Sequence, residues 1–154
     1  MPLRVFLTHS PEDLEADFGR ALPELEPTVA VIADHDWHIQ LQLHGNDLGA
    51  FVERLLARPT DLVIDHVGRI MPPRGLTSPG VTALCRLVDP GRCHVNLSAP
   101  YEGSILPRPH DDVAVLVHEL IRIAPERMLW ASNWPHPGQA KPTTIDDLCD
   151  WRAA

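Results

Sequence analysis

The sequence of 154 residues has no long hydrophobic run and few cysteines or aromatic residues. Its apolar stretches are short, and the one near the N-terminus soon reaches acidic residues, so we expect neither a secretory signal nor a membrane-spanning helix. The three cysteines, Cys85, Cys93 and Cys149, are odd in number and lie in apolar surroundings. We therefore predict buried free thiols and a cytoplasmic location, not a disulfide framework.

Positive charge is also scarce, because 13 Lys and Arg residues stand against 21 Asp and Glu residues, for a net charge of −8. The basic residues are scattered, which argues against binding to the nucleic-acid backbone or to a membrane surface. The phosphate-binding motifs G-x-G-x-x-G and G-x-x-x-x-G-K-[ST] do not occur. A nucleotide-binding doubly wound domain is therefore disfavoured.

Five short apolar runs, separated by segments with helical periodicity, organise the chain. They are rich in Val, Ile or Leu on both faces, which is typical of parallel strands covered on both sides. The runs are Leu3–Thr8, His38–Leu43, Leu62–His66, Cys93–Ser98 and Met128–Ser132. The intervening helices are predicted to begin near Ser10, Pro27, Asn46, Ser78 and Asp111, and a last helix near Thr143. This alternation predicts an α/β fold with a parallel sheet, in a single domain over residues 1–154.

Polar side chains follow three of the predicted strands at the point where each strand ends. Asp65 and His66 end one run, Asn96 and Ser98 lie at the end of the next, and Asn133 follows the last. Because parallel strands bring their carboxyl ends to one edge of a sheet, we expect these groups to converge. A histidine and a carboxylate placed in this way are typical of a divalent-metal site or of acid–base catalysis.

Several motifs resemble one enzyme family. They are "DHVGR" (Asp65–Arg69), "NLSAPY" (Asn96–Tyr101) and "LWASNWPHP" (Leu129–Pro137), supported by "DWHIQLQL" (Asp36–Leu43) and "LRVFL" (Leu3–Leu7). Together they resemble the amidohydrolase-related TIM-barrel hydrolases, most nearly the branch similar to 2-pyrone-4,6-dicarboxylate lactonase. The similarity extends over nearly the whole chain.

The resemblance implies a (β/α)₈ barrel that hydrolyses a lactone or a similar ester or amide bond of a small carboxylated substrate. Members of the family use an activated water, either with a divalent ion such as zinc or manganese or without a metal. By this resemblance His66 binds the metal or polarises the substrate carbonyl, Arg69 and Arg4 bind a substrate carboxylate, and Asn133 stands where the family has a catalytic aspartate. Further substrate contacts are expected from Gln42, Ser98 and Tyr101.

The chain also departs from the family. It has no His-x-His pair, which the family carries on its first strand. Five βα units cannot close a barrel that takes roughly 250 residues, so we expect a partial barrel, corresponding to strands four to eight, in a truncated chain. Gln42 stands in place of a tyrosine, while Ser10 and Glu102 stand in place of arginines. These changes make specificity for a pyrone dicarboxylate doubtful.

Asn133 weakens the catalytic prediction, because an amide cannot take up a proton at neutral pH. A general base typically contributes about 10²–10⁴-fold in rate, so its loss predicts a weak catalyst. His136, three residues further on, is a candidate substitute base. Structural interpretations remain open as well: His66 could be a core histidine, Asn133 could cap the strand end, and Arg69 could lie on the surface.

Two hypotheses from different classes follow. The first is a hydrolase of the amidohydrolase type that acts on a lactone. The second is a non-catalytic α/β module whose unpaired edge strands, Leu3–Leu7 and Met128–Ser132, pair with a second copy or with a separately encoded N-terminal half.

Overall fold

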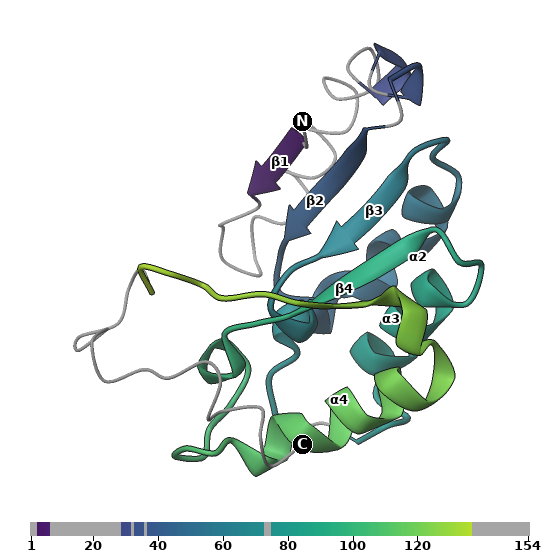
Figure 1. The fold of residues 1–154 in the computed structure, drawn as a ribbon. Helices are drawn as coiled ribbons and strands as arrows, with labels where there is room; N and C mark the ends of the chain where they lie inside the picture. Colours follow the sequence, from purple (N-terminus) through teal and green to yellow (C-terminus); the bar gives the residue numbers. More distant parts are fainter. Residues whose placement is uncertain (1–2, 7–28, 32, 36, 73–74, 137–154) are drawn as a thin grey trace.

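The computed structural model describes residues 3–6, 29–31, 33–35, 37–72 and 75–136. Its centre is a five-stranded parallel sheet in which each strand pairs with the next one along the chain (Figure 1). The strands are β1 (Leu3–Phe6), β2 (His38–Gln42), β3 (Asp61–Ile64), β4 (Cys93–Leu97) and β5 (Met128–Trp130). The predicted α/β fold with a parallel sheet is therefore confirmed.

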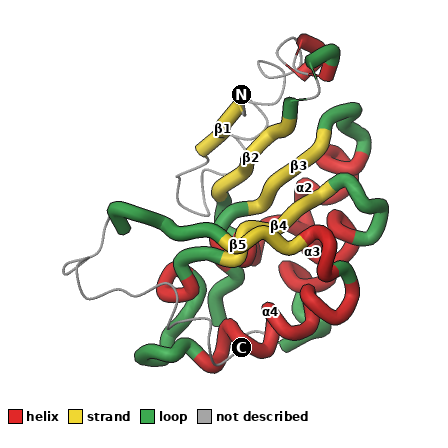
Figure 2. Tube along the Cα trace, viewed as in Figure 1, coloured by secondary structure: helices red, strands yellow, loops and turns green. Residues whose placement is uncertain are grey.

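Three amphipathic α-helices pack on one face of the sheet (Figure 2). They are α2 (Leu48–Leu56), α3 (Pro79–Val88) and α4 (Asp111–Ile123). Residues 29–31 and 33 are also helical. Proline at the first position of α3 and acidic residues in the first turn of α4 favour the observed starts. The helices predicted to begin at Ser10 and Thr143 lie outside the described residues.

Short 3₁₀ turns follow three strands at their carboxyl ends. They are η1 (Gly45–Asp47) after β2, η2 (His66–Arg69) after β3 and η3 (Pro100–Glu102) after β4, while a fourth, η4 (Pro125–Arg127), precedes β5. Because η2 begins at His66, β3 ends at Ile64 instead of at His66, where the sequence predicted the strand to end.

The two faces of the sheet differ, contrary to the prediction that both are apolar. On one face, Ile39, Leu62 and Cys93 lie side by side in register and pack in the helix-covered core. Side chains alternate along a strand, so Gln40 and Asn96 lie on the opposite face. There both donate hydrogen bonds to Asp65, which makes this face polar near the carboxyl ends of the strands.

Strand β5 is more exposed than predicted. Leu129 and Trp130 retain 40% and 57% of their accessible surface, although their run was predicted to form a buried strand. Trp134, just after the strand, is 75% exposed. The reason is the position of β5 at the edge of the sheet, where β4 is its one pairing partner within the described chain.

A close contact between backbones holds η2 in place. A Cβ atom on Gly45 would lie 2.0 Å from the carbonyl oxygen of Gly68, and one on Gly80 would lie 2.5 Å from the carbonyl oxygen of Gly45. Only glycine leaves room for such an approach. The start of α3, the turn η1 and the turn η2 are therefore stacked directly on one another, which fixes the turn that carries His66.

Candidate active site

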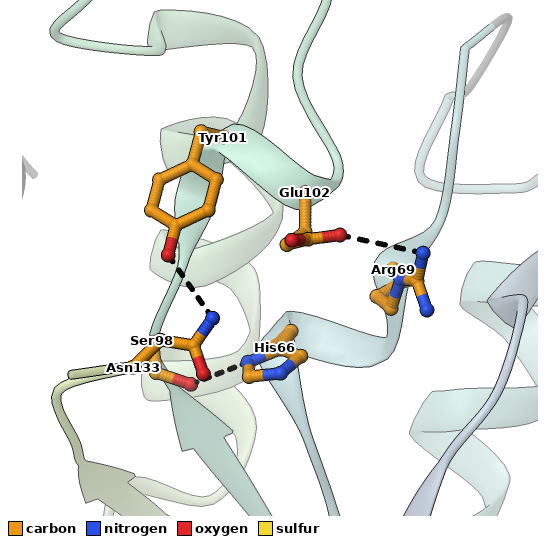
Figure 3. Close-up of polar contacts among 6 residues, drawn as sticks. All are labelled: His66, Arg69, Ser98, Tyr101, Glu102 and Asn133. Carbon is orange, nitrogen blue, oxygen red and sulfur yellow. Dashed lines mark hydrogen bonds and ion pairs between the residues drawn. The ribbon is translucent and has the colours of Figure 1, made fainter. Parts of the chain in front are cut away.

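His66 is the first residue of η2 and is buried beneath the carboxyl edge of the sheet. Its Nδ1 lies 2.9 Å from the Ser98 hydroxyl, 32 residues further along the chain (Figure 3). Burial lowers the pKa of His66 from its ordinary value of 6.5; Asp65 and Glu102 oppose this shift, and Arg69 adds to it. The imidazole is therefore mostly neutral at pH 7 and can donate or accept one hydrogen bond at Nε2.

The backbone of η2 is unusual, because all four of its residues have positive φ angles. They are +56° at His66, +53° at Val67, +76° at Gly68 and +48° at Arg69. A left-handed conformation costs a non-glycine residue about 1–2 kcal/mol. Strained backbone of this kind clusters at functional sites. Here it places both His66 and Arg69 at the carboxyl edge of the sheet.

Asp65, the residue before His66, joins the neighbouring strands through hydrogen bonds. Its Oδ1 accepts hydrogen bonds from Gln40 Nε2 and Asn96 Nδ2, both at 2.6 Å, and its side chain is buried. Asp65 is thus the acidic partner of two amides from neighbouring strands, and its negative charge raises the pKa of His66. The sequence predicted that this carboxylate would lie at the edge, in a divalent-metal site or an acid–base site. The structure instead makes it the acceptor of two amide hydrogen bonds.

Tyr101, Asn133 and His136 form a second group. Asn133 Nδ2 donates to the Tyr101 hydroxyl at 3.0 Å, and the same hydroxyl lies 3.0 Å from His136 Nδ1. Since the hydroxyl accepts from Asn133, it can donate its own proton to His136 Nδ1. His136 is 4% exposed. The structure therefore brings together three residues that the sequence had placed in different roles.

Arg69 and Glu102 form an ion pair across the two turns η2 and η3. Arg69 Nη2 lies 3.3 Å from Glu102 Oε2, and both side chains are 19% exposed (Figure 3). Arg69 was predicted to bind a substrate carboxylate, and the structure shows that a carboxylate of the chain itself already lies against it. Among the residues that the structure describes, the buried Nε of Arg69 has no hydrogen-bond partner.

For the other predicted substrate-binding residues, the structure gives the position in the sheet but no contact with the site. Gln42 is half-buried at the end of β2, beside Phe6 in the register of the sheet. Arg4 lies on β1 in register with Gln40, and its side chain is not among those described. Ser10 lies outside the described residues.

A metal site is not complete in the described part of the chain. No group of three His, Cys, Asp or Glu side chains that could hold an ion occurs there. His66 Nδ1 is engaged by Ser98, and Asp65 Oδ1 accepts two amide hydrogen bonds. Because catalytic zinc sites use about three protein ligands, these residues do not fit a divalent ion by themselves. The zinc or manganese ion expected at His66 stays a prediction.

Comparison with known proteins supports the family resemblance. A 34% identical relative, the D-galactarolactone isomerase of Agrobacterium fabrum (strain C58 / ATCC 33970), matches 66% of this chain and 35% of its own length. The 4-sulfomuconolactone hydrolase of Hydrogenophaga intermedia is 29% identical over 84% of this chain and 42% of its own length. The 2-pyrone-4,6-dicarboxylate hydrolase of Comamonas testosteroni is 27% identical over 74% of this chain and 40% of its own length. The chain thus spans less than half the length of these relatives.

The fold has solved counterparts as well. An amidohydrolase from Burkholderia multivorans, determined with bound zinc, superposes with a TM-score of 0.70 over 87% of this chain and 49% of its own. Its sequence is 18% identical, so the likeness is one of fold. No helix among the described residues has the length and apolar character to cross a membrane. The amidohydrolase family model matches residues 4–154, and the chain therefore belongs to the amidohydrolase family.

Proposed function

We propose that this protein is a hydrolase that opens a lactone, or a similar ester or amide bond, in a small carboxylated substrate. The observation that carries the proposal is the Tyr101 hydroxyl held between Asn133 and His136 at the same edge as buried, neutral His66. The relatives support this reaction type, because two of them are lactone hydrolases and a third is a lactone isomerase. The substrate itself remains part of the proposal.

In this proposal His66 polarises the carbonyl group that is attacked. When the Ser98 hydroxyl donates to Nδ1, the proton of the neutral imidazole lies on Nε2 and is available to a carbonyl oxygen. The carbonyl oxygen gains negative charge as the tetrahedral intermediate forms, so this hydrogen bond strengthens along the reaction. Ser98 acts as a positioning residue, because it fixes the tautomer and the orientation of the ring.

Tyr101 and His136 activate the water molecule in this proposal, because Asn133 cannot serve as a base. A water molecule gives a proton to the Tyr101 oxygen while the phenol passes its own proton to His136 Nδ1, and the hydroxide attacks the carbonyl carbon. The C–O bond of the lactone ring then breaks. The alkoxide takes the proton back along the same path, so one water is consumed and His136 is neutral again. Asn133 orients the phenol by its hydrogen bond.

Substrate recognition is assigned to Arg4, Arg69 and Gln42, as the family resemblance implies. We also propose that residues 1–154 form a single domain that corresponds to strands four to eight of a (β/α)₈ barrel. A cytoplasmic location is compatible with the free thiols of Cys85 and Cys93. The chemistry proposed for the site uses its side chains alone.

The test is a hydrolysis assay of the purified chain against a panel of lactones, with EDTA and with added Zn²⁺ or Mn²⁺. We expect turnover above background that is lost in His66→Ala and reduced about 10²–10⁴-fold in Tyr101→Phe or His136→Gln. His118→Ala is the matched control, because His118 lies on the exposed surface of α4 and should not change the rate. Turnover that survives His66→Ala, or no turnover under any condition, would contradict the proposal.

A second candidate function is favoured by one observation. Leu129 and Trp130 of the edge strand β5 are 40% and 57% exposed, as in a strand that pairs with another chain. In this case the protein is a non-catalytic α/β module that binds a second copy or a separate N-terminal half. Sedimentation velocity distinguishes the two functions: a monomer at all concentrations that melts cooperatively argues against the module.

A further inference from the structure

The Arg69–Glu102 ion pair lies within the candidate site and not on a remote surface. Arg69 is three residues after His66 in the same turn, and Glu102 is next to Tyr101 in η3. Both charges act on His66, since Glu102 raises its pKa and Arg69 lowers it. The two side chains point toward one another (Figure 3), and each is 19% exposed, so both remain accessible to a small molecule.

The pair changes what this corner of the site can bind. An unpaired arginine is suited to a substrate carboxylate, which it can bind through two parallel hydrogen bonds. Here Glu102 supplies that carboxylate at 3.3 Å, so the pair carries no net charge. A second carboxylate placed against Arg69 would lie close to Glu102 in a partly buried site, where repulsion between like charges is poorly screened.

We propose that Glu102 is a specificity-determining residue that excludes dicarboxylates from this site. The preferred substrate is a lactone with one carboxylate elsewhere and a neutral hydroxyl group at the Arg69–Glu102 corner. A hydroxyl group fits because it can donate to the carboxylate of Glu102 and accept from the guanidinium of Arg69 at the same time. This inference rests on the proposed lactone-binding function of the site, and it refines the role given there to Arg69.

The experiment measures binding, so that it does not depend on turnover. Three matched ligands are titrated by calorimetry: 2-pyrone-4,6-dicarboxylate, 2-pyrone-6-carboxylate and 4-hydroxymethyl-2-pyrone-6-carboxylate. We expect the wild-type protein to bind the hydroxymethyl compound at least about tenfold more tightly than the dicarboxylate. In Glu102→Gln the order should reverse, because Arg69 is then free to bind the second carboxylate. Glu102→Ala removes the same charge and serves as a second variant, and circular dichroism checks the folding of each.

The control is Glu119→Gln, which removes an acidic residue that also pairs with an arginine, Arg122, but lies on the outer helix α4. It should leave all three affinities unchanged. Tightest binding of the dicarboxylate to the wild-type protein would overturn the inference about Glu102, as would an equal change for every ligand in folded Glu102 variants. In both cases the lactone site itself would stand. Failure of the wild-type protein to bind any of the three ligands would instead count against the proposed function, and the inference would fall with it.

Discussion

The contact between Gly45 and Gly68 provides a quantitative test of how the site is built. In Gly45→Ala the new methyl group would lie 2.0 Å from the Gly68 carbonyl oxygen and 2.5 Å from Cγ1 of Ile70. Carbon–oxygen contacts normally begin at about 3.3 Å, so the backbone of η2 has to move by more than 1 Å. Overpacking typically costs about 1–3 kcal/mol, and the upper end applies here because the obstacle is backbone.

We therefore expect Gly45→Ala to lower the free energy of unfolding by about 3 kcal/mol, a large part of the usual total of about 5–15 kcal/mol. In urea, with a slope of about 2 kcal/mol per molar, the unfolding midpoint should fall by about 1.5 M. Turnover should fall as well, because η2 carries His66 and Arg69.

Gly49→Ala is the matched control for this substitution. Gly49 is an exposed residue of α2, and its new methyl group would find its nearest neighbour, the Pro79 carbonyl oxygen, at 3.9 Å. Alanine should stabilise the helix there by about 0.5–1 kcal/mol. A Gly45→Ala protein with the wild-type urea midpoint, or a midpoint equal to that of Gly49→Ala, would refute the close contact between η1 and η2.

Three further predictions concern the pH dependence of stability, the hydrogen bonds of Asp65 and the reactivity of Cys93. Because folding lowers the pKa of His66, the unfolded chain binds a proton at a higher pH than the folded chain does, and the free energy of unfolding should fall as the pH drops below about 6.5. Urea titrations should show a shallower fall in His66→Gln, and equal pH profiles for the two proteins would contradict the burial argument. Asp65→Asn should lower the free energy of unfolding by about 1–2 kcal/mol, because the hydrogen bonds from Gln40 and Asn96 would then go to a neutral acceptor. An unchanged urea midpoint would argue against this network. Burial raises the pKa of Cys93 to about 12, so peptide mapping after alkylation at pH 8 should find Cys93 labelled in denaturant but not in the folded protein.

Much of the fold follows from local sequence patterns. The apolar runs predicted strands whose starts at His38, Cys93 and Met128 agree with the structure, and helical spacing with start signals predicted α2, α3 and α4. These features depend on residues close together in the chain. The exposed β5 was missed, because the burial of Trp130 depends on what lies beside the edge strand and not on its own apolar character.

The candidate site was predictable in part. The sequence placed His66, Ser98 and Asn133 at the ends of strands, and the hydrogen bond between His66 and Ser98 agrees with that convergence. It could not identify the link from Tyr101 to His136, which joins residues 35 apart through two loops. Nor could it predict the left-handed turn η2, since residues other than glycine adopt positive φ angles only where the surrounding structure imposes them.

The sequence by itself determined the alternation of strands and helices, the membership in the amidohydrolase family and the kinds of side chain available for chemistry, because these depend on residue type and local spacing. The tertiary structure alone decided which of those side chains meet. It paired Arg69 with Glu102 and gave Asp65 two amide partners, because strand register and turn geometry set distances between residues that are far apart in the chain.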